Sequence, residues 1–308
     1  MQVNWNGVYP AITTKFTKDD SLDLELFSKN LEFQIEAGID GIVLAGSLGE
    51  ASTLTNDEKF ELVKETLKIT KDKIPVILNI AEQSTKEAIR IVKEAENKGV
   101  HGFMLLPPMR YTADSFETVE YFKSIAGSTS LPIMIYNNPI DYKIPVTLEM
   151  FEKLEEFENI NAVKESTRDV TNVTRMINKF GKRFKILCGV DTIALECLAL
   201  GADGWVAGLV CAFPKETVAI YRLVKSGRIN EAVEIARWFL PLLELDINTK
   251  LVQNIKLAET YTGIGSEFVR APRLPLNGTE REKVRNIIGN ALKDKPVLPD
   301  YLSIKIEN

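Results

Sequence analysis

The chain has 308 residues, 45% of them hydrophobic and 26% charged, and its 38 Lys and Arg residues against 43 Asp and Glu residues give a net charge of −5. This length allows either two domains or one large barrel of roughly 250 residues. The acidic balance offers no basic surface for a nucleic acid or an anionic membrane, and the hydrophobic content excludes a disordered chain. We therefore expect a globular protein with a sizeable core and with neither a nucleic-acid nor a membrane partner.

The cysteines and the apolar runs indicate the compartment. Cys188, Cys197 and Cys211 form no C-x-x-C pair and are odd in number, so no disulfide framework is predicted. The first residues lack a basic stretch followed by an apolar one, and no apolar run reaches the roughly 18 residues of a membrane span. We expect a cytoplasmic protein.

Histidine chemistry is almost excluded, because His101 is the only histidine of the chain. One histidine cannot form an H-E-x-x-H zinc site, and Ser-His-Asp or Cys-His catalysis would depend entirely on it. His101 lies where a helix is predicted to end and a strand to begin, which in α/β barrels is the end remote from the active site. We expect it to be structural or merely solvated.

Short apolar segments alternate with amphipathic helical segments as far as about residue 225. The apolar segments are nearly continuous, which is typical of parallel strands that are buried on both faces. We predict eight strands, at Val8–Ile12, Gly41–Ala45, Pro75–Ile80, Gly102–Leu106, Pro132–Tyr136, Asn161–Lys164, Lys185–Cys188 and Gly204–Ala207.

Helix signals occupy the segments between these strands. Ser21 is a candidate N-cap of the first helix, Thr55 and Glu58 form a capping-box pattern, and Thr147 precedes a helix that runs to Leu154. After Pro214 the pattern becomes entirely helical. The helices predicted there are Glu216–Ser226, Asn230–Leu245, Lys250–Tyr261 and Glu280–Leu292.

Eight βα units favour an α/β fold, a (β/α)8 TIM barrel over residues 1–225 with a C-terminal helical extension over residues 226–308. A doubly wound open sheet is the alternative fold. Dinucleotide binding has no support, because no G-x-G-x-x-G follows a strand. No long linker precedes the extension, so we expect it to pack on the barrel and to support assembly.

In such a barrel the reacting groups lie at the carboxyl ends of the strands and on the loops that follow. These positions bring an amine, a phenol, a hydroxyl and a glycine-rich turn to one mouth. They are Gly46–Glu50, Pro108–Arg110, Tyr136–Pro139, Lys164–Ser166 and Gly189–Asp191.

Lys164 is the most specific candidate for a catalytic residue among these positions. Strand alternation puts it on the face of Ala162 and away from Val163. If that face is the barrel interior, burial disfavours the ammonium and lowers the pKa of Lys164, and a neutral amine can form a Schiff base with a carbonyl or imine carbon. A lysine at a strand end that reaches solvent or pairs with Glu165 is the alternative.

Two further elements suit the same chemistry. Tyr136 ends the neighbouring strand, where its phenol could relay protons beside a reactive lysine or simply pack. The Gly46–Glu50 turn could offer backbone N–H groups and the Ser47 hydroxyl to a carboxylate, although a plain tight turn also explains its glycines.

In order and spacing, these stretches resemble the dihydrodipicolinate synthase / N-acetylneuraminate lyase family over essentially the whole chain. The shared elements are G-x-x-G-E at Gly46–Glu50, Y-N-x-P at Tyr136–Pro139 and the lysine element Val163–Ser166. The resemblance implies a homotetrameric TIM barrel that uses no metal or organic cofactor. It also implies that Lys164 forms a Schiff base with a 2-oxo acid, that Tyr136 shuttles protons, and that the substrate carboxylate lies against Ser47 and the amides at Leu48.

The chain departs from the family pattern at three places. Synthases that make dihydrodipicolinate usually have two adjacent threonines in the turn, and the second is here Leu48. The family's tyrosine donated across a dimer falls near Arg110, next to Tyr111, and the arginine that grips the aldehyde substrate's carboxylate is here Asp141. Sialic acid lyases also normally carry threonine where Leu48 stands. These departures disfavour a canonical synthase and a canonical sialic acid lyase.

The chain is more similar to the branch of 1-pyrroline-4-hydroxy-2-carboxylate deaminases, which act in hydroxyproline degradation. The similarity includes Gly189–Asp191 and the tail segments Arg237–Pro241, Lys250–Gln253 and Arg270–Pro275. The resulting hypothesis is hydrolytic deamination of this cyclic imino acid to 2-oxoglutarate semialdehyde and ammonia. Lys164 and Tyr136 would carry the chemistry, and the substrate-binding residues would be Ser47, Leu48, Gly189, Asp191 and Arg110, with Arg110 or Asp191 orienting the hydroxyl end.

Three alternatives remain open. The chain could be a 2-keto-3-deoxy sugar acid aldolase or dehydratase, or a divergent 4-hydroxy-tetrahydrodipicolinate synthase. In a different class, it could be a non-catalytic 2-oxo acid sensor. A covalent adduct at Lys164 would exclude the sensor.

Overall fold

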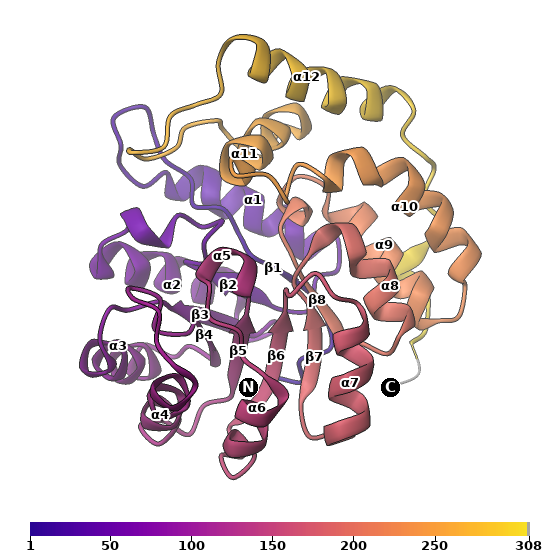
Figure 1. Cartoon of the computed structure of the whole chain (residues 1–308). Helices are drawn as coiled ribbons and strands as arrows, with labels where there is room; N and C mark the ends of the chain where they lie inside the picture. The colour runs from indigo at the N-terminus through magenta and orange to yellow at the C-terminus, as the bar shows by residue number, and fades with distance from the viewer. Residues whose placement is uncertain (307–308) are drawn as a thin grey trace.

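The computed structural model describes residues 1–306 and shows a closed barrel of eight parallel strands (Figure 1). β1 pairs with β8, and a bridge between Ala11 and Val43 joins the end of β1 to β2, which closes the ring. The predicted (β/α)8 TIM barrel is therefore confirmed, and the open doubly wound sheet is wrong. The strands are β1 (Gly7–Pro10), β2 (Ile42–Leu44), β3 (Val76–Ile80), β4 (Gly102–Leu105), β5 (Ile133–Asn137), β6 (Ile160–Glu165), β7 (Lys185–Cys188) and β8 (Gly204–Ala207).

Helices alternate with the strands and cover the outside of the barrel (Figure 1). Nearly every strand residue is buried, as the continuous apolar segments predict for strands covered on both faces. The helices of the barrel are α1 (Leu24–Glu36), α2 (Asn56–Thr70), α3 (Thr85–Asn97), α4 (Ser115–Ala126), α5 (Pro139–Tyr142), α6 (Leu148–Leu154), α7 (Thr171–Phe180), α8 (Ala194–Ala199) and α9 (Pro214–Lys225). Short 3-10 turns occur at Ala51–Thr53, Asp191–Ile193, Leu209–Cys211 and Tyr301–Ser303.

The local capping signals are partly confirmed. Thr55 and Glu58 form the predicted capping box, and Thr147 caps α6. Ser21 as the first N-cap is wrong, because the backbone of Ser21 and Leu22 pairs back onto Thr17 and Phe16. This pairing delays the helix, and the Asp23 carboxylate accepts the hydrogen bond from the Leu26 N–H at 2.9 Å instead.

Three helices follow the barrel: α10 (Ile229–Leu243), α11 (Leu251–Thr262) and α12 (Gly278–Lys293). In Figure 1 they lie beside and above the end toward which the strands point, with α11 above β1. The predicted extension over 226–308 contains these helices, and its last two residues lie outside the described part of the chain. None of the helices in residues 1–306 is both long enough and apolar enough to cross a membrane.

Two fully buried ion pairs tie α11 to the carboxyl ends of the first two strands. Lys15, in the segment after β1, donates to both carboxylate oxygens of Glu259 at 2.7 Å, and Thr13 donates to the same carboxylate. Lys256 donates to Glu50, the last residue of the glycine-rich turn, at 2.5 Å. A buried charge needs such a partner, so these pairs fix the position of the extension over the barrel mouth.

We predict that Lys15→Met destabilises the protein by about 3 kcal/mol, because it leaves the Glu259 carboxylate buried without its ammonium. Urea unfolding at neutral pH measures the loss. Arg90→Met is the matched control, since Arg90 pairs with Glu87 on the exposed surface of α3 and its removal should leave the unfolding midpoint unchanged. Equal midpoints for the wild type and Lys15→Met would show that the buried pair contributes nothing.

Candidate active site

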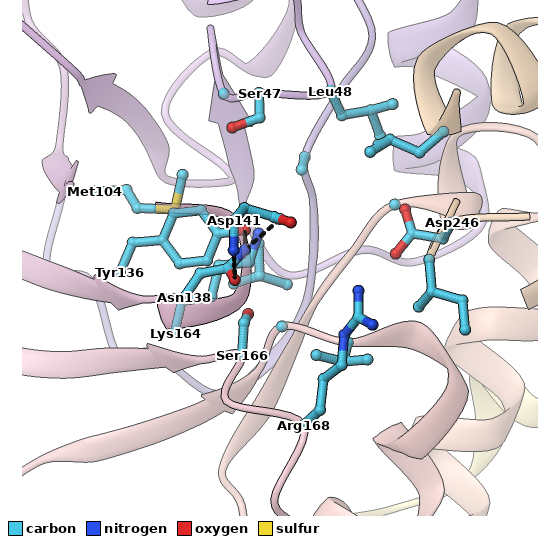
Figure 2. A pocket seen from close by; sticks show the side chains of 18 residues that line it. Ser47, Leu48, Met104, Tyr136, Asn138, Asp141, Lys164, Ser166, Arg168 and Asp246 are labelled. Carbon is cyan, nitrogen blue, oxygen red and sulfur yellow. Dashed lines mark hydrogen bonds between the residues drawn. The ribbon is translucent and has the colours of Figure 1, made fainter. Parts of the chain in front are cut away.

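One pocket lies at the carboxyl ends of the strands and encloses about 670 Å³, its open mouth included. Its walls combine strand ends, the loops after them and the start of the extension, and Figure 2 shows their side chains. The lining residues are Ala11, Gly46, Ser47, Leu48, Met104, Tyr136, Asn138, Asp141, Lys164, Ser166, Arg168, Gly189, Val190, Val206, Gly208, Asp246, Ile247 and Leu251.

Lys164 extends from β6 into this pocket and is only 6% exposed. Its Nζ lies 4.2 Å from the centre of the Tyr136 ring, and no carboxylate in residues 1–306 forms an ion pair with it. Burial lowers the pKa of Lys164, although the charges of Tyr142, Asp246 and Asp191 oppose that shift. Burial thus favours the neutral amine, which is the form of lysine that acts as a nucleophile.

The register of the sheet explains why Tyr136 and Lys164 meet. They are direct partners on the neighbouring strands β5 and β6, so both side chains emerge at the same level of the barrel. Asn138 donates its amide to the Tyr136 hydroxyl at 3.1 Å. Burial is the largest effect on the phenol and raises the pKa of Tyr136 to about 12, so that it carries its proton at neutral pH.

Gly189, at the end of β7, leaves the space that Lys164 occupies. A Cβ there would lie 2.6 Å from two carbons of the Lys164 side chain and 2.1 Å from the Ser166 hydroxyl. That hydroxyl is buried and makes no hydrogen bond within the described residues, so it is free for a ligand in the pocket. Gly189 therefore belongs to the site through the room it provides.

The glycine-rich turn forms the opposite wall. Ser47 is exposed to the pocket, and its hydroxyl is hydrogen-bonded to that of Tyr142 at the end of α5. The Tyr142 ring packs edge-on against the Tyr136 ring, with centroids 5.5 Å apart. Leu48 is buried and presents an alkyl side chain to the pocket. Sequence reasoning missed Tyr142, which lies one helical turn beyond the Y-N-x-P element.

Three charged side chains surround the outer part of the pocket. Asp141 accepts a hydrogen bond from Asn138 at 2.7 Å, and Arg168 follows β6 with a left-handed backbone of φ 63°. Asp246 comes from the segment between α10 and α11, and Figure 2 shows it with Arg168 across the pocket from Tyr136. Sequence reasoning missed Arg168 and Asp246, since neither lies at the end of a strand.

Two expected substrate contacts lie elsewhere. Asp191 is buried outside the pocket lining, where its carboxylate accepts hydrogen bonds from the Trp205 indole at 2.9 Å and the Leu209 N–H at 2.7 Å. It thereby holds the loop after β8. Arg110 is exposed on the loop after β4, away from the pocket lining.

The remaining chemistry-bearing residues stay outside the site. His101 lies at the amino end of β4, where its Nδ1 accepts a hydrogen bond from the Val76 N–H at 3.0 Å. Cys188, Cys197 and Cys211 are buried free thiols. Within residues 1–306, no group of three or more His, Cys, Asp or Glu side chains is arranged to hold a metal ion.

Comparison with known proteins gives one consistent family. A 4-hydroxy-tetrahydrodipicolinate synthase of Moorella thermoacetica is 31% identical over 296 residues, which cover 96% of this chain and 100% of that protein. The corresponding synthase of Methanothrix thermoacetophila is 30% identical over 286 residues, which are 92% of this chain and 96% of that protein.

Solved structures agree with the sequence comparison. The 4-hydroxy-tetrahydrodipicolinate synthase of Methylacidiphilum fumariolicum matches with a TM-score of 0.89 at 32% identity, covering 94% of this chain and 96% of that one. The dihydrodipicolinate synthase of Acinetobacter baumannii, complexed with pyruvate, matches with a TM-score of 0.88 at 27% identity, covering 94% and 99%. The model of the dihydrodipicolinate synthetase family matches residues 4–291, and the chain belongs to this family.

Proposed function

We propose that the protein is a class I enzyme that forms a Schiff base between Lys164 and a short 2-oxo or 2-imino acid. The observation that carries this proposal is the buried Lys164 amine, which faces a pocket, has a lowered pKa and lacks an ion-pair partner among the described residues. A buried lysine that has a lowered pKa and no ion-pair partner suits attack on an electrophilic carbon.

The groups around Lys164 suit the steps of this chemistry. The substrate carboxylate would lie against the Ser47 hydroxyl and the backbone amides of the Gly46–Glu50 turn, which places C2 near Nζ of Lys164. Tyr136 holds its proton at neutral pH, so it can donate that proton to the group that leaves C2 and then take one back from C3.

For the substrate, we propose 1-pyrroline-4-hydroxy-2-carboxylate. It has one carboxylate, which suits a pocket with one anion-binding turn and with the Asp141 carboxylate farther out. Leu48 supplies an alkyl surface instead of a second hydroxyl in that turn. A small ring with a single hydroxyl suits such a surface better than a polyhydroxylated chain does.

The proposed reaction has four stages. Lys164 adds to C2, and the ring nitrogen leaves C2 as a primary amine on C5, which opens the ring. The protonated Schiff base makes C3 acidic, and loss of the C3 proton gives an enamine. Expulsion of the C4 hydroxyl as water then regenerates the Schiff base with a C3–C4 double bond. Tautomerisation to a C5 imine and two hydrolyses release ammonia and 2-oxoglutarate semialdehyde, so that one water molecule is consumed overall.

A second candidate is a divergent 4-hydroxy-tetrahydrodipicolinate synthase, which the names of the relatives favour over the deaminase. In the pocket, Arg168 supports this candidate, because its guanidinium forms no ion pair within residues 1–306 and could bind the second carboxylate of such a product. Asp141, beside the same space, opposes it, since its carboxylate repels another.

Reduction by borohydride in the presence of pyruvate is predicted to trap one adduct on Lys164 of the wild type, and none on Lys164→Met. Intact-mass and peptide measurements detect the adduct. Lys185→Met is the matched control, because Lys185 begins the adjacent strand β7 and is paired with Asp203 at 2.7 Å. It should retain full trapping. An adduct on Lys164→Met at the wild-type level, or no adduct on the wild type, would refute the proposal that Lys164 is the nucleophile.

The rate of adduct formation should depend on pH through Lys164. Burial lowers its pKa below the ordinary 10.5, so the free amine is present at a lower pH than in a solvated lysine. We predict that the initial rate of trapping rises with pH, reaches half its maximum below pH 10.5, and then stays level. A rate that rises only near the titration of an ordinary lysine contradicts the buried neutral amine.

The substrate is tested by product. With 1-pyrroline-4-hydroxy-2-carboxylate, the wild type is expected to release ammonia and 2-oxoglutarate semialdehyde, and Lys164→Met to release neither. Three parallel reactions identify the alternatives: formation of 4-hydroxy-tetrahydrodipicolinate from pyruvate and an amino acid semialdehyde, and release of pyruvate or loss of water from a 2-keto-3-deoxy sugar acid. If one of these three reactions proceeds while 1-pyrroline-4-hydroxy-2-carboxylate yields no ammonia, the proposed deaminase activity is wrong and the observed activity takes its place.

A further inference from the structure

We propose that Asp246 is the acid that protonates the departing C4 hydroxyl in the deamination, an inference that rests on the proposed function. The reaction expels hydroxide from carbon, which is a poor leaving group unless a proton reaches its oxygen as the bond breaks. The chain therefore needs a protonated group in the part of the pocket where the C4 end of the substrate would lie.

Asp246 reaches this pocket from the first loop of the C-terminal extension. The segment between α10 and α11 contributes Asp246 to the wall across from Tyr136 (Figure 2). Gly208, just after β8, makes room for it, because a Cβ at Gly208 would lie 2.2 Å from one carboxyl oxygen of Asp246. The carboxyl group is thus packed on the backbone of the barrel mouth.

The three acidic side chains in and around the pocket differ in their partners. Asp191 accepts hydrogen bonds from the Trp205 indole and from backbone N–H groups, and Asp141 accepts one from Asn138. The Asp246 carboxyl accepts none from any residue between 1 and 306 and forms no ion pair with them. Of the three, only Asp246 is both in the pocket lining and free to serve a substrate.

The surroundings of Asp246 keep its proton in place. Burial is the largest effect, and together with the neighbouring carboxyl of Asp191 it raises the pKa of Asp246 well above the usual range. Asp141 on α5 acts in the same direction, while Lys164 on β6 and Arg168 after β6 act in the opposite one. Asp191 differs in that the Trp205 indole and backbone N–H groups donate to its carboxylate, whereas no residue between 1 and 306 donates a hydrogen bond to the Asp246 carboxyl.

The proposed step conserves atoms and charge. In the enamine, the electron pair on the Lys164 nitrogen re-forms the C2–N double bond, the C2–C3 pair moves to form the C3–C4 double bond, and the C4–O bond breaks. The oxygen leaves with the bonding pair and takes the proton of Asp246, so that water departs and an Asp246 carboxylate remains. Solvent returns the proton before the next turnover.

The experiment compares Asp246→Asn with Asp141→Asn, which removes the neighbouring carboxylate that is held by Asn138. We expect Asp246→Asn to lower kcat for ammonia release by roughly 100-fold or more, and to lose the fall in rate that deprotonation of the acid causes at high pH. Asp141→Asn should keep that alkaline fall. Both variants should still form the pyruvate adduct on Lys164, because this step needs no C4 leaving group.

A second pair of measurements separates an acid from a structural residue. The 4-chloro analogue of the substrate expels chloride, which needs no proton, so Asp246→Asn should process it at the wild-type rate. Gly208→Ala displaces the Asp246 carboxyl without removing it, and it should show the same selective loss with the hydroxylated substrate. Asp246→Asn with wild-type ammonia release, or with equal losses for both leaving groups, would overturn the proposal. Failure of the proposed function differs from either result, because the wild type itself would then release no ammonia.

Discussion

The site depends on one constraint, the exclusion of water from a lysine amine inside a closed barrel. A charged ammonium without a partner is costly to bury, so the proposed nucleophile is held at the expense of stability at this position. The barrel supplies the enclosure, and the missing Cβ of Gly189 supplies the space for the side chain. Tyr136 has the matching property, since the same burial keeps the phenol protonated beside the amine. One physical effect therefore sets both partners of the proposed chemistry.

The walls of the pocket are held by charges that do not face it. Glu50 lies at the end of the glycine-rich turn with a left-handed backbone, and it accepts hydrogen bonds from Lys256 on α11 and from the Arg270 N–H. The turn that would bind a substrate carboxylate is thus anchored to the C-terminal extension rather than to its own neighbours. The extension also brings Asp246 to the opposite wall. It contributes to the site as directly as the strands do.

The sequence predicted the barrel and the central pair of residues, because both follow from regularities of parallel sheets. Apolar segments of strand length identify the strands, and the convergence of their carboxyl ends brings Tyr136 and Lys164 together. Tyr142, Arg168 and Asp246 could not be found in this way. They lie on loops and short helices whose paths depend on tertiary contacts, such as the Ser47–Tyr142 hydrogen bond and the packing of Asp246 on Gly208. The N-cap of α1 likewise lies at Asp23 instead of Ser21, because Ser21 and Leu22 pair with Thr17 and Phe16.

The two buried ion pairs of α11 also order events during synthesis. Lys15 and Glu259 are separated by most of the chain, as are Glu50 and Lys256. While the ribosome has produced only the eight strands, both early side chains lack the partners that allow their burial, and the glycine-rich turn has no anchor. The barrel can begin to assemble cotranslationally, but a nascent chain of that length lacks the α11 partners of Lys15 and Glu50 at the carboxyl ends of the strands. Both ion pairs can form only after α11 has been synthesised, so the anchor of the glycine-rich turn is completed late.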